Sequence, residues 1–242
     1  MRLLIIRHAE PDYSIDSLTE KGWVEAEYLS EKLSKMDIKA IYTSMLGRAK
    51  DTAAVTLKKM GREADGSFEW LNEFSPSIVR PHCDKPSICW DWMPSDWTAV
   101  SDFYDREKWS STEPMLSGGV KEEYKRVTEN FDKLLAEHGY IRDKNCYRAE
   151  KPNMDTVALF CHFGLGCVLI SHLIGVSPMT LWHGLCAAPS SVTTLTTEER
   201  QEGVAYFRMN SYGDVSHLYA KGEESSFAAR FCEMYQNKDE RH

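Results

Sequence analysis

Apolar residues along this chain form short continuous runs that alternate with longer stripes at helical spacing. Two continuous runs, residues 3–6 and 156–161, are typical of strands that are buried on both faces of a sheet. Shorter runs predict four further strands, at 40–43, 68–71, 192–196 and 204–208. The pattern therefore predicts about six strands, and the polar turn before residue 204 indicates that the last two are antiparallel neighbours.

Residues at helical spacing fill most of the intervals between these strands. Thr19 offers an N-cap for the first helix, and Gly61 ends the second. The most regular stripe runs from Gly119 to Gly139, and an apolar helix follows Gly164. Such alternation predicts an α/β fold, a three-layer α/β/α sandwich in which helices cover both faces of a mixed, mostly parallel sheet.

One segment, residues 75–116, departs from this alternation. It holds five of the nine prolines and four of the seven tryptophans, so it is too aromatic for a disordered linker. A long ordered insertion is usually a lid or a binding loop, although a packed excursion without a ligand stays an alternative. We therefore expect a single domain over residues 1–242 with an inserted lid at about 75–116. A second, polar excursion at 142–155 predicts a surface hairpin.

Composition and charge narrow the possible partners of the chain. The net charge is −8 over 242 residues, which gives no general attraction for nucleic acid or an anionic membrane surface. The longest apolar run is far shorter than the roughly 20 residues that cross a bilayer. Seven cysteines without a Cys-x-x-Cys pair argue against a disulfide framework and for a reducing cytoplasm. We thus expect a cytoplasmic protein without nucleic-acid or membrane partners, and the sequence does not indicate an oligomeric state.

Two histidines occupy equivalent places at the ends of predicted strands. Arg7 and His8 follow the first strand, and His162 follows the strand at 156–161. Ligands of open α/β sheets bind at the carboxyl ends of strands, so this placement predicts that the two imidazoles meet. The alternatives are a solvated charge pair for Arg7 and His8, and a structural histidine for His162.

Arg48 lies in the first turn of a predicted helix, where the helix dipole disfavours a cation. A bound anion would explain its place, because a helix N-terminus also offers free N–H groups. The alternative is a surface arginine that pairs with Asp51 or Glu69.

Taken in chain order, these motifs resemble the histidine phosphatase superfamily, the phosphoglycerate-mutase-like proteins. Such proteins begin with a strand that runs into Arg-His-Gly, which Arg7, His8 and Ala9 approximate. Residues 18–26 match their Leu-Thr-x-x-Gly-x-x-Glu-Ala motif, and residues 44–53 match Ser-x-x-x-Arg-Ala-x-x-Thr-Ala. Matches to Leu-x-Glu and His-Gly-Gly follow at residues 71–73 and 162–164. Phenylalanine after the second histidine excludes the branch with a His-Asp motif.

The resemblance implies a role for each matched residue. His8 would be the nucleophile, His162 a second catalytic histidine and Glu73 the proton donor. The implied phosphate-binding residues are Arg7, Arg48, Phe163 and Ser14. No metal or other cofactor is implied. The chain departs from the family pattern at Ala9 and Phe163, and at Pro11 and Ser14, where many members have threonine and asparagine.

Phosphate chemistry accounts for this set of residue types. Two guanidinium groups can hold the oxygens of a phosphoryl group through charge-assisted hydrogen bonds, which is work that other enzymes assign to magnesium. A neutral imidazole can attack phosphorus and form a phosphohistidine. The sequence therefore predicts a metal-independent phosphomonoester hydrolase that acts on a small phosphorylated metabolite. The alternatives are phosphoryl transfer of the phosphoglycerate-mutase type and a non-catalytic phosphate-binding or scaffold domain.

Overall fold

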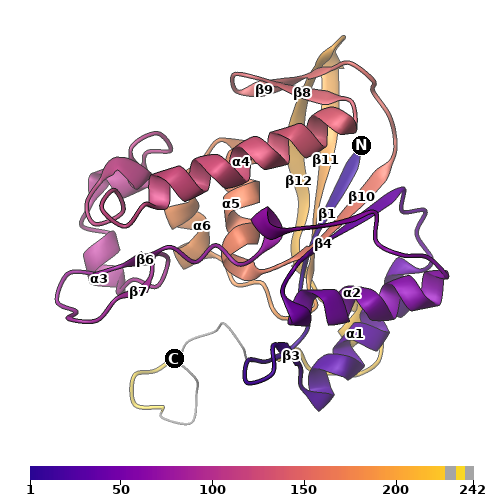
Figure 1. Ribbon diagram of the computed structural model, residues 1–242, viewed down its shortest axis with the longest axis horizontal. Coiled ribbons are helices and arrows are strands. Elements are labelled where there is room, and N and C mark those ends of the chain that lie inside the picture. The colour runs from indigo at the N-terminus through magenta and orange to yellow at the C-terminus, as the bar shows by residue number, and fades with distance from the viewer. Residues whose placement is uncertain (227–232, 238–242) are drawn as a thin grey trace.

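A mixed sheet of eight strands runs through the centre of the molecule (Figure 1). The computed structural model describes residues 1–226 and 233–237, so Cys232 lies outside the described residues. In spatial order the strands are β5 (Gly66–Phe68), β4 (Ala40–Ser44), β10 (Thr156–Cys161), β1 (Arg2–Arg7), β11 (Val192–Gln201), β12 (Val204–Asp214), β9 (Cys146–Ala149) and β8 (Tyr140–Asp143).

The first four strands in this order pair in parallel, and the remaining pairs are antiparallel. Strand β10 is central, because it pairs with β1 on one side and with β4 on the other. In the register, Arg7 lies opposite Cys161, so β1 and β10 leave the sheet side by side at their carboxyl ends. The predicted mixed sheet is confirmed.

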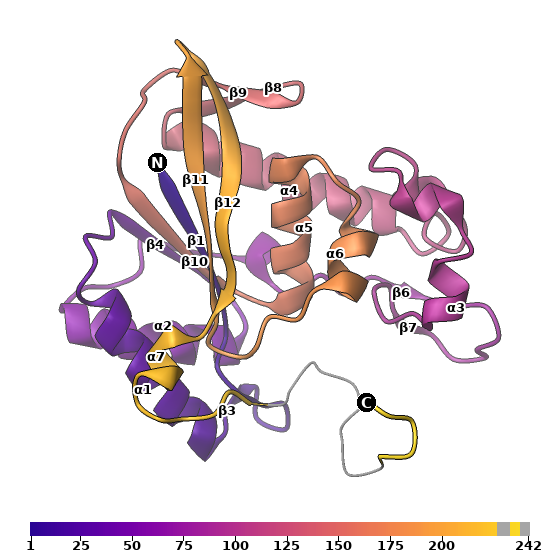
Figure 2. The same ribbon diagram turned by 180° about the vertical axis from the view of Figure 1, so that it is seen from behind.

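Helices cover both faces of the sheet, which confirms the predicted three layers (Figure 2). On one face α1 (Glu20–Leu33) and α2 (Gly47–Met60) pack on Leu4 and Ile6 of β1. On the other face α4 (Val120–Glu137) and α5 (Phe163–Ile174) share a core with Leu3 and Ile5. Successive side chains of a strand point to opposite faces, so one apolar run serves both cores.

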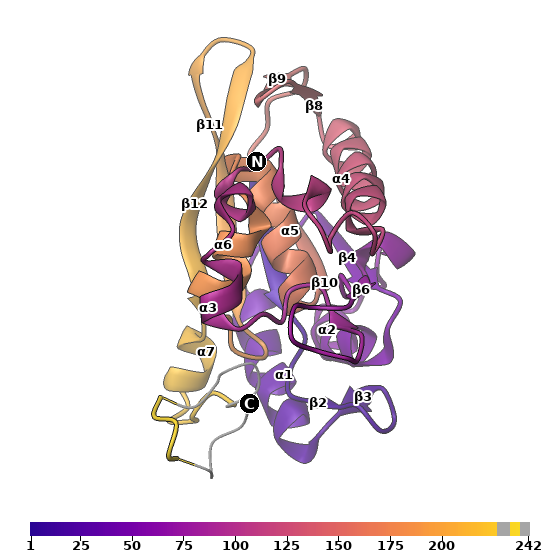
Figure 3. The ribbon, with the colours of Figure 1, turned by 90° about the vertical axis from the view of Figure 1, so that its left-hand side faces the viewer.

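The sheet has eight strands rather than the expected six or so, because the polar excursion is part of it. Strands β8 and β9 form the predicted hairpin, and β9 pairs with β12 through Tyr147 and Ala205. The long β11–β12 ribbon carries this hairpin at its far end (Figure 3). Only Tyr140 and Tyr147 of the hairpin are buried, so its sequence lacks the apolar run that would have indicated a place in the central sheet.

The predicted strand at 68–71 is wrong in its bounds. Strand β5 ends at Phe68, and Glu69–Leu71 form the 3-10 helix η1. This short helix buries Trp70 and Leu71 and turns the chain toward the carboxyl ends of the parallel strands. Asn72 and Glu73 follow it directly.

The segment at 75–116 is ordered and mostly packs into the larger core. Its elements are β6 (Ser77–Ile78), β7 (Ser87–Ile88), α3 (Pro94–Trp97), η2 (Ser101–Tyr104) and η3 (Trp109–Ser111). Trp92 packs edge-on against Phe103, and Trp109 packs edge-on against Trp182 of α6 (Pro178–Gly184). Trp90 differs, because it contacts Phe163 at the start of α5. Aromatic packing thus accounts for most of the tryptophan content.

The remaining elements lie near the amino-terminal helices. They are the hairpin of β2 (Pro11–Asp12) and β3 (Ser17–Leu18), and α7 (Ser216–Tyr219) beside α1. Among the described residues, no helix has both the length and the apolar character needed to cross a membrane.

Candidate active site

Two buried histidines face each other where β1 and β10 end. His8 follows β1, and His162 is the N-cap residue of α5. Their ring centroids are 5.1 Å apart, with 57° between the ring planes. The side chains are 2% and 1% exposed. The parallel register of β1 and β10 therefore brings together the two imidazoles that the sequence placed at strand ends.

The tautomer of His8 follows from its hydrogen bond to the main chain. Its Nδ1 lies 2.8 Å from the carbonyl oxygen of Ala9, and a carbonyl can only accept, so Nδ1 carries the hydrogen. Burial, followed by the charge of Arg7, lowers the pKa of His8 well below its ordinary value of 6.5. The ring is therefore neutral near pH 7, with a lone pair on Nε2.

Arg7 is held in place from two sides. Its Nη1 donates to the carbonyl oxygen of Ala187 at 2.6 Å, and its Cζ lies 5.8 Å from the ring centroid of Phe163. Trp90 meets the same ring edge-on at 5.9 Å. Phe163, expected among the phosphate-binding residues, thus places its ring over a guanidinium. Packing in this buried position restricts the orientations open to Arg7.

Arg48 pairs with Asp16, not with Asp51 or Glu69 as the surface alternative expected. Its Nη1 donates to Asp16 Oδ1 at 2.5 Å, and Gly47 N donates to the second carboxylate oxygen at 2.7 Å. The sequence missed this pair because Asp16 lies in the β2–β3 turn, far from Arg48 in the chain. Among the described residues the buried Nε of Arg48 has no hydrogen-bond partner, so it is available to an anion.

The loop that carries Asp16 fits closely against the start of α2. Asp16 has a positive φ of 49°, and its carbonyl oxygen lies 2.0 Å from where a Cβ on Gly47 would stand. Only glycine permits this approach. Although burial opposes it, the hydrogen bonds from Gly47 and Arg48 lower the pKa of the Asp16 carboxyl. The ionised Asp16 carboxylate thus binds the N-terminus of α2, and it offsets part of the positive charge of Arg48.

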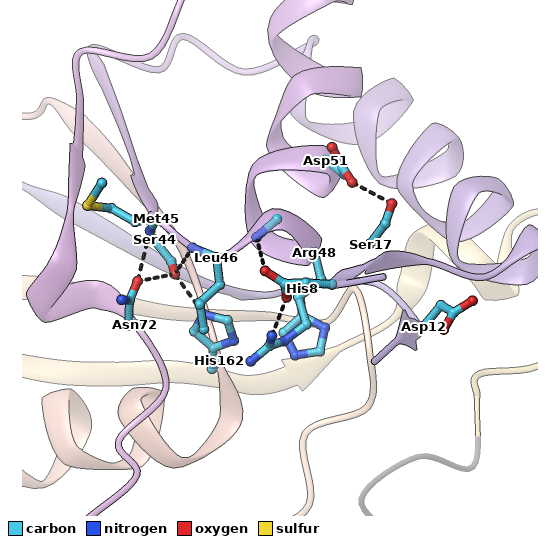
Figure 4. A network of polar contacts seen from close by, with 12 residues as sticks. His8, Asp12, Ser17, Ser44, Met45, Leu46, Arg48, Asp51, Asn72 and His162 are labelled. Carbon is cyan, nitrogen blue, oxygen red and sulfur yellow. Dashed lines mark hydrogen bonds and ion pairs between the residues drawn. The ribbon is translucent and has the colours of Figure 1, made fainter. Parts of the chain in front are cut away.

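Ser14 does not join this group of side chains. Its N–H and its Oγ both donate to Asp12 Oδ1, at 2.9 and 2.6 Å, in an exposed turn. Asp12 lies away from His8 and His162 (Figure 4). Tyr13, between Asp12 and Ser14 in the sequence, has its ring centroid 5.3 Å from Arg48 Cζ. A phosphate contact for Ser14 stays a prediction.

Glu73 lies at the N-terminus of α5. Its Oε1 accepts hydrogen bonds from Leu165 N at 2.9 Å and from Phe74 N at 2.8 Å. Burial raises the pKa of the Glu73 carboxyl, while these N–H groups and Arg7 act in the opposite direction. A carboxyl whose pKa is raised retains its proton to higher pH, as a proton donor requires.

Gly164 has no room for a side chain, because Glu73 and Trp90 fill the space beside it. A Cβ there would lie 2.8 Å from Glu73 Oε1 and 2.4 Å from Trp90 Nε1. The indole in turn donates to the carbonyl oxygen of Phe74 at 2.7 Å. Trp90 therefore contacts the same helix turn as the candidate proton donor.

A second set of polar groups supports His162, and the sequence had not predicted a role for it. His162 Nε2 lies 2.8 Å from the Oγ of Ser44, the fully buried last residue of β4. Ser44 Oγ is 2.9 Å from Asn72 Oδ1, which also accepts from Met45 N at 2.9 Å (Figure 4). Both Ser44 and Asn72 belong to motifs of the resemblance, which is the one signal that could have pointed to them.

Known proteins share part of this sequence and its fold. The sequence model of the histidine phosphatase superfamily (branch 1) matches residues 3–75. A phosphoserine phosphatase mutant from Entamoeba histolytica, solved with phosphoserine, has a TM-score of 0.57 at 17% identity, covering 90% of this chain and 98% of that one. No curated protein matches the sequence.

Two further solved structures have the same fold over most of their length. The native mycobacterial glucosyl-3-phosphoglycerate phosphatase has a TM-score of 0.56 at 21% identity, covering 88% of this chain and 98% of its own. YhfR of Bacillus stearothermophilus has a TM-score of 0.55 at 20% identity, covering 90% and 98%. The chain has a histidine phosphatase fold. The sequence match to the superfamily model covers residues 3–75, and the likeness of fold extends over about 90% of the chain.

Proposed function

We propose that this protein is a metal-independent phosphomonoester hydrolase that acts on a small phosphorylated metabolite through a phosphohistidine on His8. The observation that carries the proposal is the state of His8: a neutral ring next to that of His162, with Nδ1–H bound to a carbonyl and a lone pair on Nε2. Solved structures of similar fold are phosphatases of phosphoserine and of glucosyl-3-phosphoglycerate, which supports a small substrate.

The two arginines would hold the phosphoryl group. A guanidinium donates two parallel hydrogen bonds to a pair of phosphate oxygens, and it keeps its charge at any working pH. Arg7 is fixed by Ala187 and Phe163, and Arg48 by Asp16. Cations fixed in advance stabilise the charge that develops on the equatorial oxygens without further rearrangement.

The chemistry then follows in two steps. In the first, His8 Nε2 forms a bond to phosphorus while the ester P–O bond breaks, and Glu73 gives its proton to the departing alkoxide. In the second, water attacks the phosphohistidine, the P–N bond breaks, and Glu73 takes the proton from that water. Inorganic phosphate and the alcohol are the products, and the residues return to their starting states.

The test is to trap the phosphoenzyme. The protein is mixed with a substrate labelled at phosphorus and quenched in alkali, because a P–N bond survives base and is lost in acid. We expect label on the wild-type protein and none on His8→Ala. His138→Ala is the matched control, since this half-buried histidine bonds to Tyr42 instead of to the site.

Three results would overturn the proposal. Near-normal turnover by His8→Ala would show that His8 is not the nucleophile, and label on His162 would show that His162 is the nucleophile instead. A product that keeps its phosphoryl group at a new position would show a mutase instead of a hydrolase.

A further inference from the structure

The hydrogen atoms of the Ser44–Asn72–His162 chain can be assigned, because backbone N–H groups anchor it. Met45 N–H donates to the side-chain atom of Asn72 that lies 2.9 Å away, so that atom is the amide oxygen. The Ser44 hydroxyl lies 2.9 Å from the same oxygen and must donate to it, since a carbonyl oxygen has no hydrogen.

His162 is therefore the donor in its contact with Ser44. The single hydroxyl hydrogen of Ser44 points to Asn72, and Leu46 N–H already donates to Ser44 Oγ at 3.1 Å. The oxygen can accept a second hydrogen bond, and the group 2.8 Å from it is His162 Nε2. Nε2 must then carry a hydrogen, and a neutral His162 has its lone pair on Nδ1.

The remaining nitrogen lies on the side of the reaction centre. The ring of His162 lies between Ser44 and His8 (Figure 4), so the edge opposite Nε2 faces His8. That edge includes Nδ1, which is buried and has no hydrogen-bond partner among the described residues. A buried polar atom without a partner is costly unless a ligand satisfies it.

We propose that Ser44 and Asn72 are positioning residues that hold His162 as the Nε2–H tautomer, so that Nδ1 must take up a proton when a phosphoryl group binds. This inference rests on the proposed function. A lone pair on Nδ1 repels a phosphate oxygen, whereas Nδ1–H donates to it. The proton comes from the phosphate monoanion or from solvent, and it stays on the imidazolium while the phosphoryl group is bound.

The charges around His162 explain why the proton arrives only with the ligand. The groups that face it are His8, Arg7 and Arg48, and none of them is an anion. Burial, together with the positive charges of Arg48 and Arg7, lowers the pKa of His162 well below 6.5 in the free protein. A bound phosphate brings negative charge against the ring and favours its protonated form.

Nitrogen-15 NMR of histidine-labelled protein tests the tautomer directly. In long-range proton–nitrogen spectra near pH 7.5, we expect a protonated Nε2 and an unprotonated Nδ1 for His162 in the free protein. Saturating inorganic phosphate should protonate both nitrogens. His162→Gln identifies the signals.

Variants test the positioning residues. Asn72→Ala releases the Ser44 hydroxyl, so we expect His162 to populate both tautomers and kcat/KM to fall about tenfold, the loss of about one hydrogen bond. Asn72→Asp keeps an acceptor for Ser44 and Met45 and should restore the single tautomer. The matched control is Thr43→Val, which removes the Thr43–Ser67 hydrogen bond of 2.7 Å without touching His162.

An Nδ1–H tautomer in the free protein would overturn the inference. So would an unchanged tautomer in Asn72→Ala, or a neutral His162 in the phosphate complex. An Nε2–H tautomer that depends on Asn72, in a protein that binds phosphate but forms no phosphoenzyme, would support the inference while the proposed hydrolase failed.

Discussion

Substitution of Gly164 is expected to lower the rate of the reaction strongly while it lowers the stability of the fold only slightly. A Cβ at this position would lie 2.4 Å from Trp90 Nε1 and 2.8 Å from Glu73 Oε1. Both distances are well below the optimal separation of non-bonded atoms, roughly 3.5–4.0 Å, so the atoms would repel each other. We therefore predict that Gly164→Ala displaces the indole and moves the Glu73 carboxyl away from the start of α5.

The cost in stability should be small and the cost in rate large. Overpacking destabilises by about 1–3 kcal/mol, and alanine offsets about 1 kcal/mol of that through its helix propensity. The net loss of about 0–2 kcal/mol corresponds to a fall in Tm of at most about 8 °C for a chain of this size. A misplaced general acid costs about 10²- to 10⁴-fold in rate, but only where the leaving group needs a proton.

The assay compares two substrates that differ in leaving group. An alkyl phosphate such as phosphoserine releases a poor leaving group, whereas p-nitrophenyl phosphate releases one that departs without a proton. We expect Gly164→Ala to lose most of its kcat/KM on the first and little on the second. Gly166→Ala is the matched control, because its Cβ meets only Ile5 Cγ2, at 3.4 Å. Equal losses on both substrates would refute Glu73 as the acid.

Three other predictions concern the role of Arg48, the independence from metal ions and the pKa of the buried histidines. Arg48→Ala should lower kcat/KM by about 100-fold through the loss of a charge-assisted hydrogen bond, whereas Lys50→Ala, an exposed cation on the same helix, should have no effect. Activity should survive EDTA, and loss that magnesium or zinc restores would contradict the metal-free mechanism. Burial lowers the pKa of His8, so below about pH 6.5 the unfolded chain binds more protons than the folded protein does. The free energy of unfolding therefore falls as the pH falls. Between pH 7.5 and 5.5, the fall in the free energy of unfolding, measured in urea, should be smaller for His8→Gln than for the wild type. The remainder comes from other histidines whose pKa burial lowers, among them His162 and, to about 4, His217.

Local patterns predicted those parts of the fold that depend on local burial. The continuous apolar runs of β1 and β10 are typical of buried strands, and the two histidines at their ends lie together because parallel strands end at one edge. The β8–β9 hairpin has no such pattern, since it pairs by its backbone along the edge of the sheet. Its pairing with β12 depends on a tertiary contact that no short stretch of sequence records.

The candidate site divides in the same way. Arg7, His8, Arg48 and His162 could be found from their places in the sequence, and Glu73 from the family motifs. The partners that orient them could not. Asp16 reaches Arg48 only because its turn has a positive φ, and Ser44 meets His162 only because β4 and β10 are neighbours in space. Such contacts depend on the completed fold.

The position of β10 has a consequence for how the protein folds. Strands β1 and β4 are made early in synthesis, yet they are not neighbours, because β10 inserts between them. Pairing between segments so distant in sequence requires a long loop to close, which costs conformational entropy. It is therefore slow compared with the formation of local helices. A nascent chain that contains Arg7, His8, Arg48 and Glu73 therefore lacks both the central strand and His162. Catalytic competence should arise only in the last cooperative step of folding, which makes recovery of activity a stricter measure of refolding than recovery of helix content.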